Sequence, residues 1–307
     1  MPSLKEMVVL AVRRNPKLAQ HVWRLAIKSL PIERVTVRIN LDTSKLGVSP
    51  KGQIPLQITF PANDSVIFFG LLNENAWEPT EIASVAAALP SGETYDVLDI
   101  GANVGLFSIQ IELAKRAASS AFNFSRFLLF EPVPNIYACL TENLRAASID
   151  NGLAFNVALG NADCSAEMVL DQGNGGNNSL LAEAVDPDWA KTLTVQVRTF
   201  ASFAQAESLA FERPILLKID VQGYEPNVIA GIPENVWSKV QVALIEFTPL
   251  YFSKIEPGIR KGLFDRLAHF SRFTRLSDHS VQKCSLNQIV DVCERGSEGF
   301  FNLLAQR

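Results

Sequence analysis

A turn with two glycines separates two apolar segments, residues 95–100 and 106–114. The first segment has the composition of a buried strand, and the second has that of a helix. The turn contains Gly101, Asn103 and Gly105. Glycine accepts positive φ and lets a ligand approach the backbone, and a helix start offers free N–H groups to polar ligands. This pattern is typical of a nucleotide-like cofactor site at the carboxyl edge of a parallel sheet.

Glu131 lies at the end of the next predicted strand, directly before Pro132. A carboxylate there can accept hydrogen bonds from both hydroxyls of a ribose, and an exposed acid before a turn proline is the structural alternative. Asn103 and Leu106 stand where a dinucleotide fingerprint has its second and third glycines. Together with Asp99, these residues predict an adenosine site without provision for a pyrophosphate. This combination favours S-adenosylmethionine over NAD as the cofactor.

Two further acids, Asp220 and Glu246, end the predicted strands at 215–219 and 240–246. Methyl transfer from a sulfonium needs alignment with the acceptor, and a hydroxyl acceptor must also lose its proton. We hypothesise that Asp220 is the general base or orients the acceptor, with Glu246 second. An Asp220→Asn variant that keeps near-normal turnover would contradict this. A helix cap is the structural alternative for Asp220.

Lys218 precedes Asp220 by two residues on the same predicted strand. We count Lys218 with the catalytic group. The alternative is that its charged end extends from the buried strand to the surface. Strand-end acids can also hold magnesium, but the sequence has no dense carboxylate cluster and no metal is expected.

The elements that would position these residues alternate between strand and helix from residue 95 onward. The predicted strands cover residues 95–100, 126–130, 153–158, 215–219, 240–246, 273–277 and 300–305. The predicted helices cover residues 104–117, 134–147, 225–230 and 259–270. This alternation predicts an α/β fold, with a doubly wound, mostly parallel sheet and helices on both faces.

Residues 1–75 are predicted to form an N-terminal helical and β-hairpin extension, followed by a cofactor-binding domain over residues 76–307. Helices are expected in residues 1–34, and β-type runs follow at 35–41, 54–60 and 65–69. Another helix begins at Trp77–Pro79 and runs to about residue 89. The first thirty residues carry six basic side chains and one acidic one. A solvated helix face is the favoured explanation, and a partner or membrane surface is the alternative. These helices could also pair two chains.

Residues 161–200 interrupt the alternation and contain a glycine- and asparagine-rich loop, residues 173–178. We expect this insertion to form a lid over the acceptor, with Asn178 and Ser179 contacting cofactor or substrate. A mobile surface loop is the alternative.

Composition limits the class of protein. The chain has 307 residues, 48% of them hydrophobic, and a net charge of −4, which gives no nucleic-acid footprint. No apolar run reaches the length of a membrane helix, and no signal peptide is recognised. The four cysteines lack metal or redox spacing and indicate a reducing compartment, so a cytoplasmic location is expected.

Five motifs occur in order along the chain, and as a set they resemble the FkbM-type S-adenosylmethionine-dependent methyltransferases over about residues 76–305. They are DIGANVG at 99–105, FEP at 130–132, NVALG at 156–160, LKIDVQGYE at 217–225 and IE at 245–246. The resemblance implies a class I methyltransferase fold, Rossmann-like, with a seven-stranded sheet whose last strand is antiparallel. It also implies O-methylation of a hydroxyl, commonly on a sugar, a glycan or a natural product.

The resemblance also implies where the cofactor lies. The glycine turn would pass close to the methionine and ribose parts, and Glu131 would hold the ribose hydroxyls. Asn156 and Ala158 would lie beside adenine. The Glu78-Pro79 pair resembles the glutamate-proline pair that precedes the first helix in the family. We therefore include Glu78 and Pro132 among the expected cofactor-binding residues.

Gln222 is a departure, because many members have glutamate at this position. We expect Gln222 and Glu225 to contact the acceptor, although Glu225 also suits a helix start for structural reasons. The departure gives some weight to an alternative function: a catalytically weak S-adenosylmethionine-binding protein with a docking or regulatory role. An NAD-linked oxidoreductase is a third hypothesis, which the missing glycines disfavour.

Overall fold

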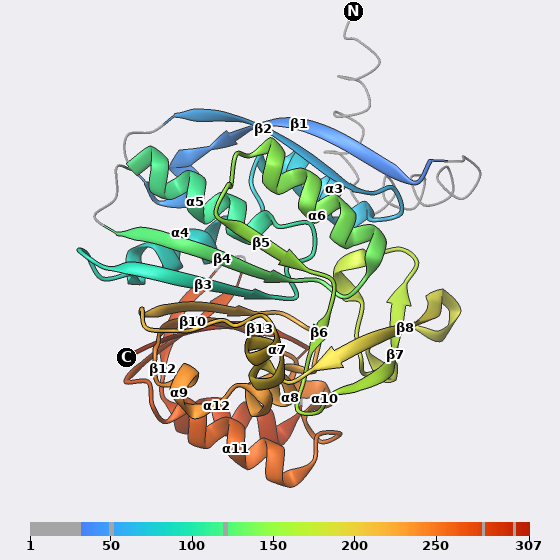
Figure 1. Cartoon of the computed structure of the whole chain (residues 1–307), viewed down its shortest axis with the longest axis vertical. Coiled ribbons are helices and arrows are strands. Elements are labelled where there is room, and N and C mark those ends of the chain that lie inside the picture. Colours follow the sequence, from blue (N-terminus) through green and yellow to red (C-terminus); the bar gives the residue numbers. More distant parts are fainter. Residues whose placement is uncertain (1–31, 49–51, 119–121, 278–279, 297–298) are drawn as a thin grey trace, which may run out of the picture.

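A central sheet of eight strands organises the molecule (Figure 1). The computed structural model describes residues 32–48, 52–118, 122–277, 280–296 and 299–307. The strand order is β12-β11-β13-β10-β9-β3-β4-β5. The bounds are β3 Thr94–Ile100, β4 Asn123–Phe130, β5 Gly152–Phe155, β9 Ile215–Ile219, β10 Val240–Phe247, β11 Arg272–Ser277, β12 Ser280–Cys284 and β13 Phe301–Gln306. β13 is antiparallel to both neighbours, whereas β5, β4, β3, β9 and β10 pair in parallel.

Helices cover both faces of this sheet, as the α/β prediction required. One face carries α4 Pro79–Ala88, α5 Leu106–Ala118 and α6 Pro134–Ala146. The other carries α7 Phe200–Ala206, α8 Glu225–Gly231, α9 Glu234–Trp237, α11 Pro257–Leu267 and α12 Leu286–Arg295, with the short α10 Pro249–Phe252 nearby. Alternate strand residues point to opposite faces, so Val97 and Leu98 of β3 belong to different hydrophobic clusters. The doubly wound fold is therefore confirmed.

The sheet has one strand more than predicted. β12 pairs antiparallel with β11 at the outer edge, and its SVQKC sequence is largely exposed. An exposed edge strand needs no apolar alternation, so hydrophobic periodicity did not identify it. The strand at 153–158 is shorter than predicted. It ends at Phe155, and Ala158–Leu159 (β6) joins a separate three-stranded sheet with β7 Cys164–Asp171 and β8 Ala190–Arg198.

The N-terminal hairpin is confirmed: β1 Arg34–Asp42 and β2 Gln53–Pro61 pair antiparallel over their full lengths. It packs on α6, where Thr59 N donates to Asn143 Oδ1 (2.7 Å) and Asn143 Nδ2 donates to Thr59 O (2.8 Å). The helices predicted in residues 1–34, and any chain pairing through them, lie almost wholly outside the described residues. The domain division at residue 75 stays a prediction.

The predicted strand at 65–69 is wrong, because these residues form the first half of α3 Ser65–Glu74. Asp64 caps this helix by accepting a hydrogen bond from Ile67 N (3.0 Å). Ile67 and Leu71 are four residues apart, so one helical face buries both. Here capping and packing outweigh the β-propensity of the apolar run.

Four 3₁₀ segments complete the described secondary structure: η1 Thr43–Leu46, η2 Gly175–Asn177, η3 Ala182–Ala184 and η4 Pro187–Trp189. The last three belong to the insertion between β7 and β8. Among the described residues, no helix is both long and apolar enough to cross a membrane.

Candidate functional site

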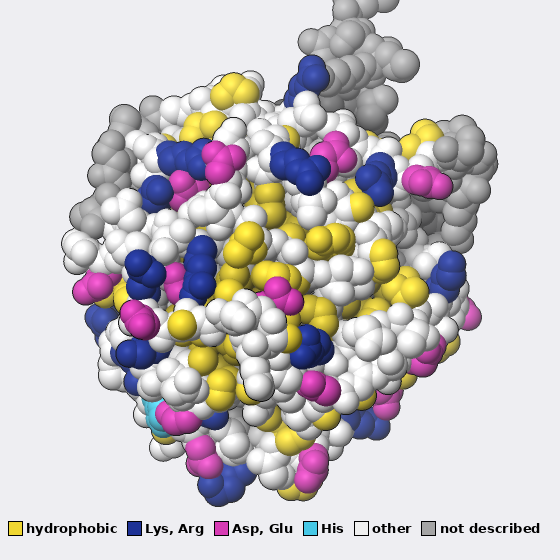
Figure 2. All heavy atoms as spheres, in the orientation of Figure 1, with side chains coloured by type: hydrophobic (Ala, Val, Ile, Leu, Met, Phe, Trp, Pro, Cys, Tyr) yellow, Lys and Arg dark blue, Asp and Glu magenta, His cyan; other side chains and the backbone are white. Residues whose placement is uncertain are grey.

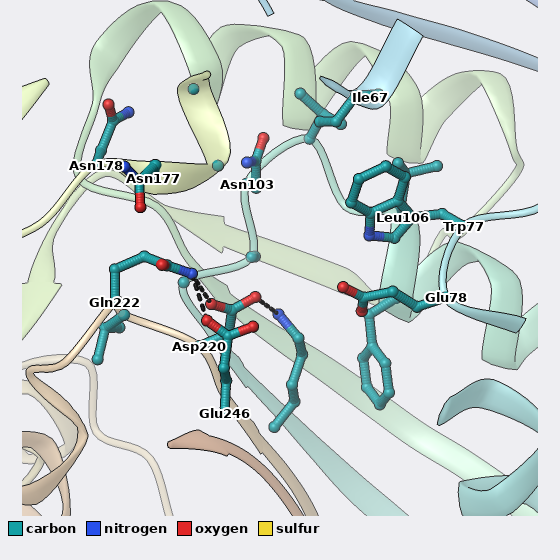
Figure 3. A pocket seen from close by; sticks show the side chains of 18 of the residues that line it. Ile67, Trp77, Glu78, Asn103, Leu106, Asn177, Asn178, Asp220, Gln222 and Glu246 are labelled. Atoms are coloured by element: carbon teal, nitrogen blue, oxygen red, sulfur yellow. Dashed lines mark hydrogen bonds and ion pairs between the residues drawn. The ribbon is translucent and has the colours of Figure 1, made fainter. Parts of the chain in front are cut away.

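A cavity of about 910 Å³ lies at the carboxyl ends of β3, β4, β9 and β10 (Figure 3). α3, residues 174–178 of the insertion and the start of β13 form its other walls. The volume lies within the range of cofactor and ligand pockets. The ends of these parallel strands form the sheet edge at which doubly wound folds bind ligands.

The glycine turn after β3 contacts the ends of both neighbouring strands, β4 and β9. Gly101 N and Ala102 N donate to Phe130 O at 3.1 and 2.9 Å, so the turn is bonded to the end of β4. Gly101 has φ of +79°, and a Cβ there would lie 1.8 Å from Asp220 O. The close approach of β3 and β9 therefore requires glycine at this position.

The three predicted turn residues have different positions. Gly101 and Asn103 line the cavity, whereas their contact with a cofactor stays a prediction. Gly105 does not line it. Its φ is +88°, and a Cβ there would lie 2.7 Å from Leu140 Cδ1, so it provides room for α6 beside the start of α5.

Glu131 is held by the main chain at the end of β4. Its Oε2 accepts a hydrogen bond from Asn103 N (3.1 Å), and its Oε1 accepts one from Val133 N (2.8 Å). Burial raises the pKa of Glu131 to about 7, although both N–H groups favour the charged form. Each oxygen can accept one more hydrogen bond, which is what a ribose diol would supply.

The other residues predicted around the cofactor divide into lining and supporting positions. Glu78, Pro132 and Ala158 line the cavity. Asp99 is fully buried and does not line it: its Oδ2 accepts from Ser108 Oγ (2.7 Å), and its Oδ1 lies 3.9 Å from Lys218 Nζ. Burial raises the pKa of Asp99, and the Lys218 charge opposes this rise.

Asn156 also lies outside the cavity. Its Nδ2 donates to Glu131 O and Pro132 O, both at 2.9 Å. It therefore supports the loop that carries Glu131.

The second group of acids lies at the ends of β9 and β10 (Figure 3). Asp220 Oδ2 lies 3.0 Å from Lys218 Nζ. Gln222 Nε2 donates to Asp220 Oδ1 (2.9 Å) and to Glu246 Oε1 (2.6 Å), so one amide joins both carboxylates. The sequence prediction that Asp220 and Glu246 lie together is confirmed in its geometry, whereas their catalytic roles stay predictions.

These groups shift one another's protonation. Burial raises the pKa of Glu246 well above its usual value, and the charges of Asp220 and Glu78 raise it further. Burial disfavours the charged form of Lys218, but Asp220, Asp99 and Glu78 outweigh it and raise the lysine pKa. Lys218 is therefore a permanent cation beneath Asp220 at neutral pH.

Of the residues predicted to contact the acceptor, Asn178 and Gln222 line the cavity, whereas Ser179 and Glu225 do not. Ser179 is fully buried, and its Oγ donates to Gln222 O (2.8 Å). Glu225 Oε1 accepts hydrogen bonds from Val221 N (3.1 Å) and Gly223 N (3.0 Å). Both residues thus hold the segment around Gln222 from outside the cavity.

The sequence interpretation missed several lining residues, among them Ile67 on α3, Trp77, Leu106 and Asn177, which Figure 3 shows around the cavity. The assignment of residues 65–69 as a strand hid the α3 wall. The capping residue Asp64, with apolar positions at Ile67 and Leu71, was a signal that could have revealed it.

The lining is strongly acidic. Its described residues include one lysine, Lys218, and six acids: Glu74, Glu78, Glu81, Glu131, Asp220 and Glu246. On the outer face shown in Figure 2, by contrast, basic and acidic side chains are interspersed. Within the described part of the chain, no group of three or more His, Cys, Asp or Glu side chains is arranged to hold a metal ion. The pocket therefore suits an organic cation better than a polyanion.

Known proteins resemble this chain in sequence and in structure. Methyltransferase 1 of Beauveria bassiana is 26% identical in an alignment of 165 positions, and the match covers 49% of this chain and 63% of that protein. Methyltransferase sdnD of Sordaria araneosa is 28% identical in an alignment of 207 positions, and the match covers 59% of this chain and 75% of that protein. This chain thus spans less than two thirds of the first relative's length.

Among solved structures, a methyltransferase FkbM from Methylobacillus flagellatus matches with a TM-score of 0.44 and 12% identity. The match covers 79% of this chain and 54% of that one. The model of the methyltransferase FkbM domain matches residues 99–274, more than half of this chain. The chain belongs to the FkbM methyltransferase domain family.

Proposed function

We propose that this protein transfers a methyl group from S-adenosylmethionine to a hydroxyl group of a sugar, a glycan or a natural-product acceptor. One observation carries the proposal. A single cavity contains both Glu131, suited to a ribose, and the pair Asp220 and Glu246, suited to a hydroxyl that must lose a proton. Membership of a methyltransferase family supports the transferase part of the proposal.

The residues of the cavity fit the cofactor. Glu131 has acceptor capacity left for two hydroxyls, and Phe130, Val157 and Ala158 provide an apolar wall for a purine. The excess of carboxylates suits a sulfonium and opposes the pyrophosphate of NAD. When bound, S-adenosylmethionine supplies an electrophilic methyl group on a positively charged sulfur.

The chain's own groups would prepare the acceptor. Asp220, which Lys218 Nζ holds in place at 3.0 Å from Oδ2, accepts the hydroxyl proton. Burial raises the pKa of Glu246, which favours its protonated form, and in that form it donates a hydrogen bond that orients the acceptor oxygen. Residues 174–178 of the insertion form part of the cavity wall and would limit the access of water to the acceptor.

We also propose a cytoplasmic location, because the spacing of the four cysteines matches neither a metal site nor a redox motif.

Calorimetry with S-adenosylmethionine and with NAD tests the cofactor, and methyl-labelled S-adenosylmethionine with a panel of hydroxylated acceptors tests the transfer. We expect saturable binding of the first cofactor, and label transfer that falls at least about 100-fold in Asp220→Asn. Asp265→Asn, an exposed acid on α11, is the matched control. Preferential binding of NAD would overturn the cofactor assignment. Tight cofactor binding without transfer to any acceptor would favour the binding protein without turnover.

A further inference from the structure

Gln222 has a strained backbone in the middle of the candidate site. Its φ is +55°, a left-handed conformation that costs a residue with a side chain about 1–2 kcal/mol. Such strain persists only where the surrounding structure fixes it, and it is concentrated at functional sites. The bonds around Gln222 show what fixes it.

Two fully or almost fully buried side chains hold this segment. Glu225 Oε1 accepts from the N–H groups on both sides of Gln222, those of Val221 and Gly223. Ser179 Oγ, from the insertion, donates to the carbonyl of Gln222 itself (2.8 Å). Three hydrogen bonds therefore determine the direction in which the Gln222 side chain leaves the backbone.

That direction places the Gln222 amide between the two acids. An amide nitrogen has two hydrogens, and Nε2 donates one to Asp220 Oδ1 and one to Glu246 Oε1. The pair is asymmetric, since Lys218 Nζ contacts Asp220 Oδ2 at 3.0 Å. Two close carboxylates disfavour double ionisation, so the acid beside the lysine keeps the negative charge.

We propose that Gln222 is a positioning residue, which joins Asp220 and Glu246 into one pair in which Asp220 holds the negative charge and Glu246 holds the proton. The proposal deepens the function given above and rests on it for its chemical meaning. The other ionisable groups facing the pair come from four elements: Asp99 on β3, Glu131 after β4, Glu78 before α4 and Glu225 on α8. All four are acids, and each interacts electrostatically with Asp220, Glu246 or Lys218. The pair therefore lies in a negative field that favours one retained proton.

The amide chemistry of Gln222 matters for this role. An ionised glutamate at position 222 would accept hydrogen bonds only, and it would add a third negative charge beside Asp220 and Glu246. Glutamine instead donates to both acids without adding charge. Glutamine at this position therefore has a structural function in this chain.

Infrared spectroscopy of the full chain tests the proposal without any acceptor. A protonated carboxylic acid has a separate C=O stretching band, and its loss in Glu246→Gln assigns that band to Glu246. In Gln222→Met, which has similar length but no donor, we expect the band at higher frequency because its carbonyl loses a hydrogen bond. We also expect the pH at which the band disappears to rise by about 1–2 pH units, because the charged form loses a donor. The matched control is Gln196→Met on β8, where Nε2 donates to Ser165 Oγ on the exposed surface.

Two results would overturn the proposal: absence of the Glu246 band in the wild-type protein, or an unchanged band in folded Gln222→Met. If Gln222→Met does not fold, Ser179→Ala decides. It keeps the amide and both acids but releases the Gln222 carbonyl, so we expect a smaller upward shift in the pH midpoint, and no shift contradicts the proposal. Calorimetry with S-adenosylmethionine distinguishes failure of this proposal from failure of the proposed function. A wild-type protein that has the band but does not bind the cofactor refutes the proposed function alone.

Discussion

Acids lie at two places along the same sheet edge, Glu131 at one and the pair Asp220 and Glu246 at the other, and different parts of the chain hold them. At the ends of β3 and β4, Glu131 is bonded by the N–H groups of Asn103 and Val133. At the ends of β9 and β10, side chains hold the acids: Lys218 contacts Asp220, and Gln222 contacts both Asp220 and Glu246. The first group is thus part of the backbone fold, and the second is a charge network among side chains.

This difference predicts which part of the site tolerates amino-acid substitutions. Main-chain donors remain when a neighbouring side chain is replaced, so the Glu131 side should resist most substitutions except those that move the backbone. The Asp220 side depends on a few side chains, so single substitutions should change its protonation while the fold survives. The following predictions test this contrast, from the largest effect to the smallest.

Gly101→Ala should disrupt both the Glu131 site and the Asp220 site, because Gly101 is where the turn after β3 contacts the end of β9. The new Cβ would lie 1.8 Å from Asp220 O, in addition to the cost of a φ of +79°. We expect the free energy of unfolding to fall by at least about 3 kcal/mol. Gly92→Ala is the matched control, since φ is +85° there and no atom lies within 4 Å of the Cβ. Chemical denaturation measures both variants, and equal losses would show that backbone strain, not contact with β9, explains the glycine.

Lys218→Met should disturb the side-chain network strongly. It leaves the buried Asp99 and the partly buried Asp220 without their cation, so we expect a loss of about 3 kcal/mol at pH 8. The remaining carboxylates then favour protons, and the variant should regain stability as the pH is lowered. Lys261→Met removes an exposed ion pair with Asp265 and should have no measurable effect. A Lys218→Met protein as stable as the control would show that the network does not depend on this charge.

The pH dependence of cofactor affinity should report on Glu131. Ribose hydroxyls donate to its charged form, so affinity for S-adenosylmethionine should rise as the pH increases through about 7. Glu131→Gln should bind at least about 10-fold more weakly at pH 8 and lose most of this slope. Glu207→Gln, at an exposed helix end, is the control. Titration calorimetry at several pH values measures the slope, and an unchanged slope in Glu131→Gln would assign it to another acid.

Protonation of Glu131 should make the free energy of unfolding change with pH in the opposite direction to cofactor affinity. Its raised pKa means that the folded chain keeps a proton that the unfolded chain has already lost between about pH 4.5 and about pH 7. The free energy of unfolding therefore decreases as the pH rises through this window. Glu131→Gln should remove this contribution, which thermal unfolding at fixed pH values can follow.

Much of the sheet was predictable because buried parallel strands leave a strong local signal. The apolar run Ile215–Ile219 was predicted with its observed bounds, and acids placed directly after such runs had to meet at one sheet edge. Position in a strand therefore predicted which acids come together. It gave no information on which side chain would lie between these acids and bond both of them.

The supporting residues were harder to predict, because their partners are distant in sequence or lie in the backbone. Ser179 contacts a carbonyl 43 residues away, and Glu225 bonds two backbone N–H groups in a strained turn. Both were expected to contact the acceptor, since only their residue types and neighbourhood were visible. α3 was missed for a related reason: its cap and its packing face, not its β-prone composition, decide its structure.

The smallest expected effect concerns the loop that carries Glu131. Asn156→Ala removes two hydrogen bonds that the side-chain amide donates to Glu131 O and Pro132 O. Asn151→Ala removes two similar hydrogen bonds, to Phe124 O and Ser125 O on the same sheet. Each should cost about 1 kcal/mol of stability. Affinity for S-adenosylmethionine should fall about 5-fold in Asn156→Ala only, because only that loop holds the carboxylate of Glu131. If both variants bind the cofactor like the wild-type protein, the main-chain bonds to Glu131 fix the carboxylate alone. The contrast between the main-chain support of Glu131 and the side-chain support of Asp220 would then be even sharper.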